Sequence, residues 1–311
     1  MALETTQDPG FGEKIIQRNQ ENMVNALGGY NVVILGAKFS SKDIYMHLTK
    51  MSWVAFLALA TISFLFINLI YAIVYCFIGE EAIVGNTKDN FFDTFWHAYF
   101  FSTQTFTTVG YGVLAPHGFL AHLIAALEAF TGLLWFALIT GLLYGRFSQP
   151  TTRITFSKNI IITPYRGITS LQLRIVNQRK SAMTEVFADL ILSINEVKED
   201  GTFHRNYYNL ALERNYVLFF PLPWTIVHPI DENSPFFGKT EEEIKATKME
   251  LFVFIKGYDD TFKQTVPTTY SYLTKDLVWG ARFARIFHIN NEGKTILEVN
   301  RNDDIELVGD F

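Results

Sequence analysis

A short run between two apolar segments has the residue types and spacing to bind a cation stripped of its water. The run is TQTFTTVGYGVLAP, residues 103–116, and its centre consists of Thr108, Val109, Gly110, Tyr111 and Gly112. Glycine adopts backbone dihedrals that other residues avoid, so successive carbonyl groups can point to one side. The carbonyls of residues 108–111, with the Thr108 hydroxyl, can supply a cage of oxygens if four chains surround one axis. The alternative is an ordinary polar turn between two membrane helices.

Two long apolar segments flank this run. Residues 51–78 contain no charged residue, and residues 119–145 contain one, Glu128. Because about 20 helical residues cross the hydrocarbon core of a bilayer, each segment is long enough to span it. The alternative for either segment is a buried helix of a soluble protein, and the lengths favour the membrane.

Basic residues flank the two spans on one side of the membrane. Lys42 and Lys50 precede the first span, and Arg146, Arg153 and Lys158 follow the second, whereas the segment between the spans holds four acidic residues and one lysine. Cytoplasmic flanks carry an excess of Lys and Arg. We therefore expect a multi-pass protein of the cell membrane (inner or plasma membrane) with both termini in the cytoplasm.

The segment between the spans predicts a re-entrant element. Residues 90–106, NFFDTFWHAYFFSTQTF, are too short to cross the membrane and return, and irregular Gly-rich backbone follows them. Such backbone is tolerated at membrane depth only where protein buries it or water lines it. One chain supplies one loop, so a closed ring of oxygens requires several copies, and we expect a homotetramer.

Three regions follow from these patterns. We expect an N-terminal cytoplasmic segment (1–40), a surface helix with a transmembrane pore domain (41–150), and a cytoplasmic regulatory domain (151–311). Ile44, Leu48 and Met51 repeat at helical spacing, which favours a helix along the membrane surface over a simple polar entry into the first span. Beyond Pro150, alternating apolar residues and turn signals predict an all-β sandwich.

Composition argues against other classes. The single cysteine excludes an internal disulfide, and the net charge of −5 gives no case for nucleic acid as a partner. The chain has no zinc spacing, P-loop or G-x-S-x-G motif, which argues against a membrane-anchored enzyme or receptor with a β domain. The part after Pro150 has no G-x-G-x-x-G motif, which argues against a nucleotide-binding Rossmann domain there. It also lacks an arginine at every third position, so we expect no voltage sensor.

The central run matches the selectivity filter of potassium channels. Four further stretches extend this likeness over nearly the whole chain: GLLYGRFSQPTTR, RIVNQRKS, WTIVHPIDENSPFFG and SYLTKDLVWGARF. With them, the sequence resembles the inward-rectifier potassium channel family, most closely its bacterial branch. The resemblance implies a non-enzymatic homotetramer with a slide helix, an outer helix, a pore helix, a filter, an inner helix and immunoglobulin-like cytoplasmic domains. It implies no cofactor, only K+ as the permeant ion, bound by Thr108, Val109, Gly110 and Tyr111.

The resemblance also places pore residues. Tyr144 falls where inner helices narrow the pore and gate by dewetting, although ordinary helix packing is the alternative. Gly132 falls at a proposed hinge, or serves close packing. Phe136 is apolar where strong rectifiers carry an acidic residue that promotes block by polyamines or Mg2+. Glu185 matches an acidic position of the cytoplasmic pore, and no second acidic ring is evident, so we expect weak rectification, with Ba2+ as a further blocker.

The surroundings of the filter depart from the family pattern. Gln104 stands where a glutamate is common, and Val113 and Leu114 offer no basic partner after the filter. The usual ion pair is therefore absent, and relaxed K+/Na+ selectivity is the alternative function. Glu128 is the only carboxylate inside a span, where charges are costly and usually functional. It either supports the back of the filter or braces adjacent subunits.

Lipid regulation is the last implication of the resemblance. Candidate residues for anionic lipids or phosphoinositides of the bilayer are Arg146, Arg153, Arg179 and Lys180. A cationic surface near an anionic leaflet is attracted to it. The stretch SQPTT replaces the lysine-rich sequence of eukaryotic members, so phosphoinositides could activate or inhibit.

Overall fold

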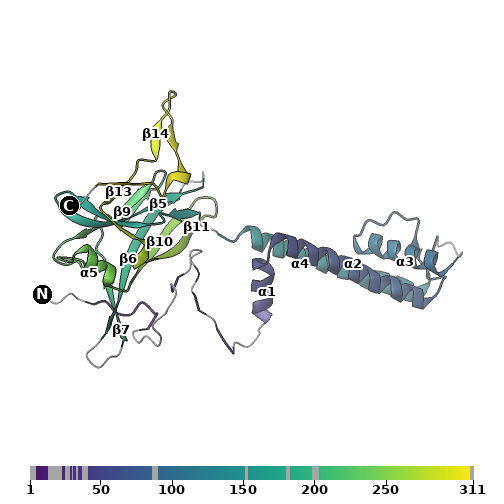
Figure 1. The fold of residues 1–311 in the computed structure, drawn as a ribbon. Coiled ribbons are helices and arrows are strands. Elements are labelled where there is room, and N and C mark those ends of the chain that lie inside the picture. Colours follow the sequence, from purple (N-terminus) through teal and green to yellow (C-terminus); the bar gives the residue numbers. More distant parts are fainter. Residues whose placement is uncertain are drawn as a thin grey trace. The chain divides into compact units, whose positions relative to one another are not determined.

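The computed structural model describes residues 5–12, 23–24, 29, 31–32, 34–36, 41–85, 90–150, 153–179, 183–197 and 203–308. The chain divides into two compact units. One runs from Gly36 to Gln149, and the other combines the residues up to Leu35 with those from Pro150 onward (Figure 1). Each unit is described by itself.

The unit from Gly36 to Gln149 is helical. Its helices are α1 (Ser41–Lys50), α2 (Trp53–Ile78), α3 (Phe91–Phe106) and α4 (Gly118–Phe147). Ser52 starts α2 by accepting the N–H of Ala55 at 3.2 Å, and Asn90 starts α3 by accepting the N–H of Asp93 at 3.0 Å. Helices α2 and α4 run antiparallel, and the shorter α3 packs against one end of the pair (Figure 1). Two short strands, β1 (Ile83–Val84) and β2 (Ala115–Pro116), pair beside α3.

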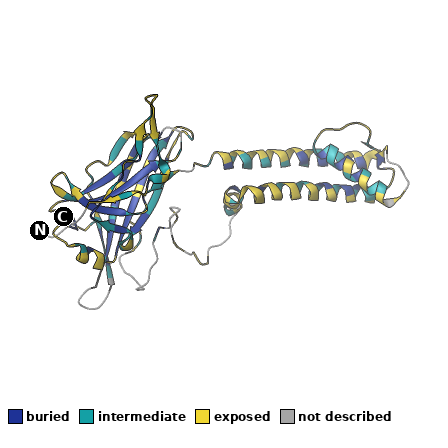
Figure 2. Cartoon of the chain, turned by 45° about the horizontal axis from the view of Figure 1, so that its top comes forward, coloured by how far each residue is buried: buried dark blue, intermediate teal, exposed yellow. Residues whose placement is uncertain are grey.

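Among the described residues, α2 and α4 are the helices long and apolar enough to cross a membrane. Only 17% and 11% of their most apolar stretches are buried, so most of their apolar surface is exposed (Figure 2). A core helix of a soluble protein would be mostly buried. The prediction of two long apolar helices with a short helix between them is confirmed.

The second unit is a sandwich of two sheets. One sheet has the order β12-β4-β5-β3, with β9 also on β5; the other has the order β11-β10-β6-β7, with β8 also on β6. The strands of the first sheet are β3 (Ile154–Phe156), β4 (Ile160–Tyr165), β5 (Ile168–Asn177), β9 (Trp224–Ile230) and β12 (Leu277–Trp279). Those of the second are β6 (Met183–Val197), β7 (Phe203–Asn209), β8 (Tyr216–Phe219), β10 (Met249–Asp259) and β11 (Gln264–Leu273).

The core lies between the two sheets. In β6 every even-numbered residue from Val186 to Ile194 is buried, whereas Phe187 and Asp189 point away from the core and are exposed. This alternation is the period of two that half-buried strands require. The predicted all-β sandwich is therefore confirmed. Smaller elements complete the unit: α5 (Glu241–Ala246), the pair β13 (Ala281–Phe283) with β16 (Ile305–Leu307), and the hairpin β14 (Phe287–Ile289) with β15 (Thr295–Leu297).

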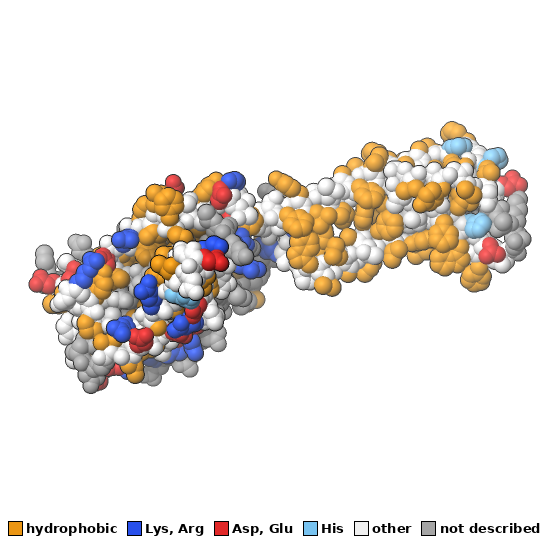
Figure 3. Space-filling view, turned by 90° about the horizontal axis from the view of Figure 1, so that it is seen from above, with side chains coloured by type: hydrophobic (Ala, Val, Ile, Leu, Met, Phe, Trp, Pro, Cys, Tyr) orange, Lys and Arg blue, Asp and Glu red, His pale blue; other side chains and the backbone are white. Residues whose placement is uncertain are grey.

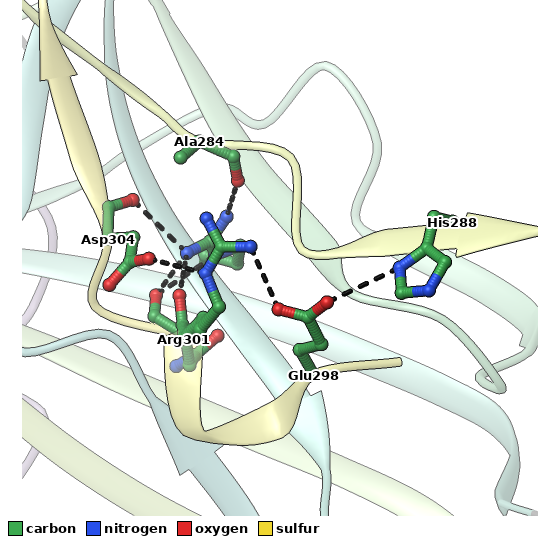
Figure 4. A network of polar contacts seen from close by, with 7 residues as sticks. Ala284, His288, Glu298, Arg301 and Asp304 are labelled. Atoms are coloured by element: carbon green, nitrogen blue, oxygen red, sulfur yellow. Dashed lines mark hydrogen bonds and ion pairs between the residues drawn. The ribbon is translucent and has the colours of Figure 1, made fainter. Parts of the chain in front are cut away.

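A buried arginine fastens the C-terminal segments to the sandwich. Arg174 of β5 donates to the backbone oxygens of Ala284 (2.6 Å) and Asn302 (3.0 Å). Outside it, Arg301 bridges the carboxylates of Glu298 (2.8 Å) and Asp304 (2.7 Å) (Figure 4). Burial lowers the pKa of Arg174 to about 10, so the guanidinium remains charged and its carbonyl partners replace water.

Candidate functional site

The filter-like run leaves the end of α3 as a tight, irregular loop. The N–H of Thr108 donates to the carbonyl of Thr105 (3.1 Å), and the N–H of Val109 donates to that of Gln104 (3.0 Å). Thr108, Gly110 and Gly112 have positive φ values of 60°, 53° and 82°. A β-branched residue rarely adopts this left-handed conformation. Left-handed residues therefore alternate with the others along the loop.

The loop is exposed in the single chain. Residues 108–113 are all exposed, with Val109 at 53% and Tyr111 at 76%. Behind the loop, the Oε1 atom of Gln104 is buried without a hydrogen-bond partner among the described residues. Val113 is also exposed.

A buried polar cluster joins three helices next to the loop. Glu128 of α4 accepts the hydroxyl of Tyr75 of α2 at 2.7 Å, and its other oxygen accepts the hydroxyl of Ser102 of α3. The Ser102 hydroxyl also lies 3.0 Å from Oδ1 of Asn68 of α2. All four residues are at most 1% exposed. Buried polar groups are stabilising when each has a partner, so the cluster ties α2, α3 and α4 together.

Gly132 touches the helix that carries the loop. A Cβ atom at this position would lie 2.0 Å from the carbonyl oxygen of Phe106, the last residue of α3. Helix α4 runs unbroken through Gly132. The contact gives a physical reason for close packing, whereas a hinge at Gly132 stays a prediction.

The other predicted pore residues lie in two places. Phe136 and Tyr144 are exposed on α4, at 43% and 75%. Glu185 is exposed on β6 with a φ of 51°, where the pairing with β10 shifts register between Lys256 and Tyr258. A bulge of this kind re-aims a side chain out of the regular pleat. The structure therefore groups the filter, Gln104, Glu128 and Gly132, and leaves Glu185 in the other unit.

Arg146 is buried rather than free for a lipid. Its Nη1 donates to the carbonyls of Leu48 (2.6 Å) and Thr49 (3.2 Å), and its Nη2 donates to that of Met51 (2.7 Å). Its guanidinium also lies 4.6 Å from the ring centroid of Trp53. Arg146 thus fastens the end of α4 to the junction of α1 and α2.

The remaining lipid candidates differ in exposure. Arg153 is exposed. Arg179 is partly exposed and lies 3.7 Å from Asp259 and over the ring of Phe262. Lys180 lies outside the described residues.

Known proteins match both units. The family described as the inward rectifier potassium channel C-terminal domain matches residues 154–309, and the one described as ion channel matches residues 53–149. The inward rectifier potassium channel Kirbac3.1 of Paramagnetospirillum magnetotacticum is 32% identical over 285 residues, which are 91% of this chain and 95% of that protein. The chain belongs to the inward rectifier potassium channel family.

Eukaryotic members of the family are more distant from this channel. The inward rectifier potassium channel 4 of Homo sapiens is 28% identical over 201 residues, 61% of this chain and 44% of that protein. The ATP-sensitive inward rectifier potassium channel 15 of Mus musculus is 25% identical over 287 residues, 85% of this chain and 75% of that protein. The chain is an ion channel and not an enzyme, and its resemblance to the prokaryotic branch is confirmed.

Reasoning from the channel's sequence missed the partners of Glu128. Asn68, Tyr75 and Ser102 stand in strongly apolar segments, and Asn68 and Tyr75 are two helical turns apart on one face of α2. Polar residues with that spacing in an apolar helix indicate one face that packs against other polar groups, and this pattern could have located the partners of Glu128. Thr6 donates its N–H to the carbonyl of Tyr207 (2.8 Å), and Val24 accepts the hydroxyl of Ser271 (3.0 Å). No local pattern in the sequence pointed to these two contacts with the sandwich.

Proposed function

We propose that four copies of this chain form a potassium-selective channel in a cell membrane, and that residues 108–111 of each copy line the conduction path. The observation that carries the proposal is the alternation of left-handed residues at Thr108, Gly110 and Gly112. In an extended strand, successive peptide groups point to opposite sides. A left-handed residue between them turns consecutive carbonyls to the same side, which builds a row of oxygens for a dehydrated ion.

The exposure of the loop supports assembly. Irregular backbone at membrane depth needs a protein or water lining, and one chain covers one side of a path only. The end of α3 adds to cation binding, because a helix carries partial negative charge at its C-terminus. K+ is the permeant ion, bound by Thr108, Val109, Gly110 and Tyr111.

Glu128 and Gly132 act as positioning residues for the filter. The hydrogen bond from Ser102 to Glu128 and the close approach of Gly132 to Phe106 both fix α3, which carries the filter. This favours support of the filter within one subunit over a brace between subunits. These contacts of Glu128 and Gly132 also take the place of the ion pair that Gln104 and Val113 cannot form.

Gating and rectification follow from the α4 surface. Exposed Tyr144 narrows the path where four inner helices meet, and an apolar constriction closes by dewetting. Phe136 brings no charge to the cavity, so block by internal polyamines or Mg2+ rests on Glu185 and is weak. The excess of basic residues before α2 and after α4 favours both termini in the cytoplasm.

Anionic lipids, including phosphoinositides, are proposed to act through Arg153, Arg179 and Lys180. Arg146 is left out of this set because its side chain is buried and both of its Nη groups donate to backbone carbonyls. A cationic surface close to an anionic leaflet is worth about 1 kcal/mol for each Lys or Arg.

Flux from liposomes reconstituted with the purified channel tests the proposal. We expect Ba2+-sensitive K+ flux that exceeds Na+ flux by at least about a hundredfold, since each factor of ten needs about 1.4 kcal/mol of discrimination. Equal K+ and Na+ fluxes would favour the relaxed cation channel. No Ba2+-sensitive flux of either ion would overturn both.

A further inference from the structure

The sandwich unit contains a cavity on the outer face of its first sheet. The cavity has a volume of about 580 Å³ and is lined by residues of β4, β5 and β9. In β5, Leu171 and Leu173 point into the core, so Gln172 between them points to the outer face. Small-molecule sites typically have volumes of about 300–1,000 Å³, and this cavity lies within that range.

The floor of this cavity is polar. Thr163 of β4 and Gln172 of β5 are buried, and Thr225 of β9 is half-buried. The Nε2 atom of Gln172 donates one of its two N–H groups to the hydroxyl of Ser170 at 2.9 Å. Its second N–H and the hydroxyls of Thr163 and Thr225 make no hydrogen bond with any residue that the structure describes. The floor therefore offers donors to a ligand that accepts hydrogen bonds.

Three arginines from separate segments line the same cavity. Arg166 belongs to the turn between β4 and β5, Arg214 lies between β7 and β8, and Arg282 lies in β13. Glu213 is the acidic residue of the lining, so three arginines and one glutamate give the lining a net charge of +2. Arg282 also pairs with Glu306 of β16 at 2.8 Å, outside the lining. The positive charge of the lining favours an anionic ligand.

The carboxylate of the lining is already bound by protein groups, whereas one guanidinium is not. Glu213 forms an ion pair with Arg166 through Oε1 and accepts the hydroxyl of Tyr165 through Oε2. Arg214 makes no ion pair and no side-chain hydrogen bond with any described residue. The donors of Arg214 can therefore bind an anion without breaking a contact within the protein.

We propose that this cavity binds a small phosphorylated sugar or polyol, with the phosphate at the arginines and the hydroxyl-bearing part on the polar floor. A phosphate monoester carries a charge of about −1.5 to −2 at pH 7 and three acceptor oxygens, which match the charge and the donors of the lining. The planar fork of arginine suits phosphate geometry. The cavity lies wholly within the sandwich unit, and its binding does not rest on the proposed channel function.

Calorimetric titration of the full-length channel in detergent with glycerol 3-phosphate tests the site. We expect saturable binding to the wild type and at least about tenfold weaker binding to Arg214→Gln, the factor that corresponds to about 1.4 kcal/mol. Arg285→Gln removes an exposed arginine of the same unit outside this cavity and is the matched control. No saturable binding to the wild type, or equal affinity in Arg214→Gln and the wild type, would overturn the site.

Further titrations test the class of ligand. Inorganic phosphate should bind more weakly than glycerol 3-phosphate, because it leaves the floor unused. Thr225→Val removes a hydroxyl of the floor with little change in shape, so it should weaken glycerol 3-phosphate at least about threefold and leave inorganic phosphate unchanged. Equal affinity for the two probes would overturn the role of the floor. Tighter binding of succinate, or binding of phosphatidic acid in nanodiscs without binding of the soluble ester, would overturn the proposed ligand in favour of a dicarboxylate or a lipid.

The unfolding temperature of the full-length channel gives a second readout. A ligand that binds the folded state alone stabilises it by mass action, so the unfolding temperature of the wild type should rise with the concentration of glycerol 3-phosphate. Phosphate also stabilises proteins in general because it is excluded from their surfaces, so the comparison with Arg214→Gln at equal concentration isolates the site. An identical rise in both proteins would count against specific binding.

Discussion

At the scale of residues, the proposed filter is held by a buried carboxylate and a close glycine contact, and not by the ion pair that is usual in the family. Glu128 receives hydroxyl hydrogen bonds from two other helices, and Gly132 leaves no room for a side chain beside Phe106. Both contacts lie on the face of α4 that meets α3. The position of the filter is therefore sensitive to small changes on this face.

Gly132→Ala should damage conduction more than its size suggests. The added methyl group would lie 2.0 Å from a backbone carbonyl, which can move only if the end of α3 and the filter move. We expect K+ flux to fall at least about tenfold or Na+ flux to rise, since overpacking typically costs about 1–3 kcal/mol. Gly141→Ala on the same helix meets no atom within 4 Å and is the control. Equal flux in the two variants would contradict the packing role.

His228 should make the stability of the channel pH-dependent. Its Nδ1–H donates to Ala211 O (2.7 Å), and its Nε2 accepts from the hydroxyl of Ser234 (2.8 Å). Burial lowers the pKa of His228 below 6.5, so the unfolded chain takes up the proton first as pH falls.

This contribution of His228 to stability is complete above pH 6.5 and is lost as pH falls from there toward the folded pKa. Below pH 6.5 we expect the full-length channel to lose up to about 1.4 kcal/mol of unfolding free energy per pH unit. Its unfolding temperature should fall accordingly. His228→Gln should show a smaller drop. An identical pH dependence in both proteins would rule out this origin.

At the scale of elements, the end of α4 is joined to the α1–α2 junction through one side chain. Arg146 donates to the carbonyl of Leu48, near the end of α1, and to that of Met51, between α1 and α2. Helix α1, the slide helix, and helix α4, the inner helix, therefore move together, or water replaces the hydrogen bonds of Arg146 when they separate.

Arg146→Gln should lower the stability of the channel, whereas Arg153→Gln should weaken its dependence on anionic lipid. Arg146→Gln removes charge-assisted bonds worth about 1.5–3 kcal/mol each, so the unfolding temperature should fall by several degrees while flux keeps its dependence on anionic lipid. Arg153→Gln should weaken the lipid dependence and leave the unfolding temperature unchanged. If Arg146→Gln abolished lipid dependence without loss of stability, Arg146 would belong to the lipid site.

At the scale of the whole molecule, polar and apolar surfaces are segregated. Large apolar side chains are exposed along α2 and α4, whereas the lysine, arginine and acidic side chains seen in Figure 3 lie mostly on the sandwich unit, among apolar ones. An exposed apolar surface of this extent marks contact with lipid or with other copies. A channel assembled in a membrane accounts for both surfaces. Within such a channel, a charged side chain can promote block of outward current only if it lines the conduction path.

Phe136→Asp should convert weak rectification to strong rectification. The substitution adds a carboxylate to an exposed position of α4, and four copies attract a polyamine strongly in a cavity of low dielectric. We expect spermine applied to the inner side of membrane patches to block outward current at a concentration at least about tenfold lower than in the wild type. Phe136→Asn has a similar shape without charge and should resemble the wild type. Equal block in the two variants would exclude Phe136 from the path.

The sequence by itself determined the spans, the re-entrant helix, the filter-like run, the sandwich and the family. These features are contiguous in the chain, because helical length, alternation and motif spacing are local properties. Only the tertiary structure decided the partners of Glu128, the tight contact of Gly132, the burial of Arg146 and the contacts of Thr6 and Val24 with the sandwich. Each of these joins residues far apart in the chain, and no local pattern records which distant atom will fill the space or accept the hydrogen bond.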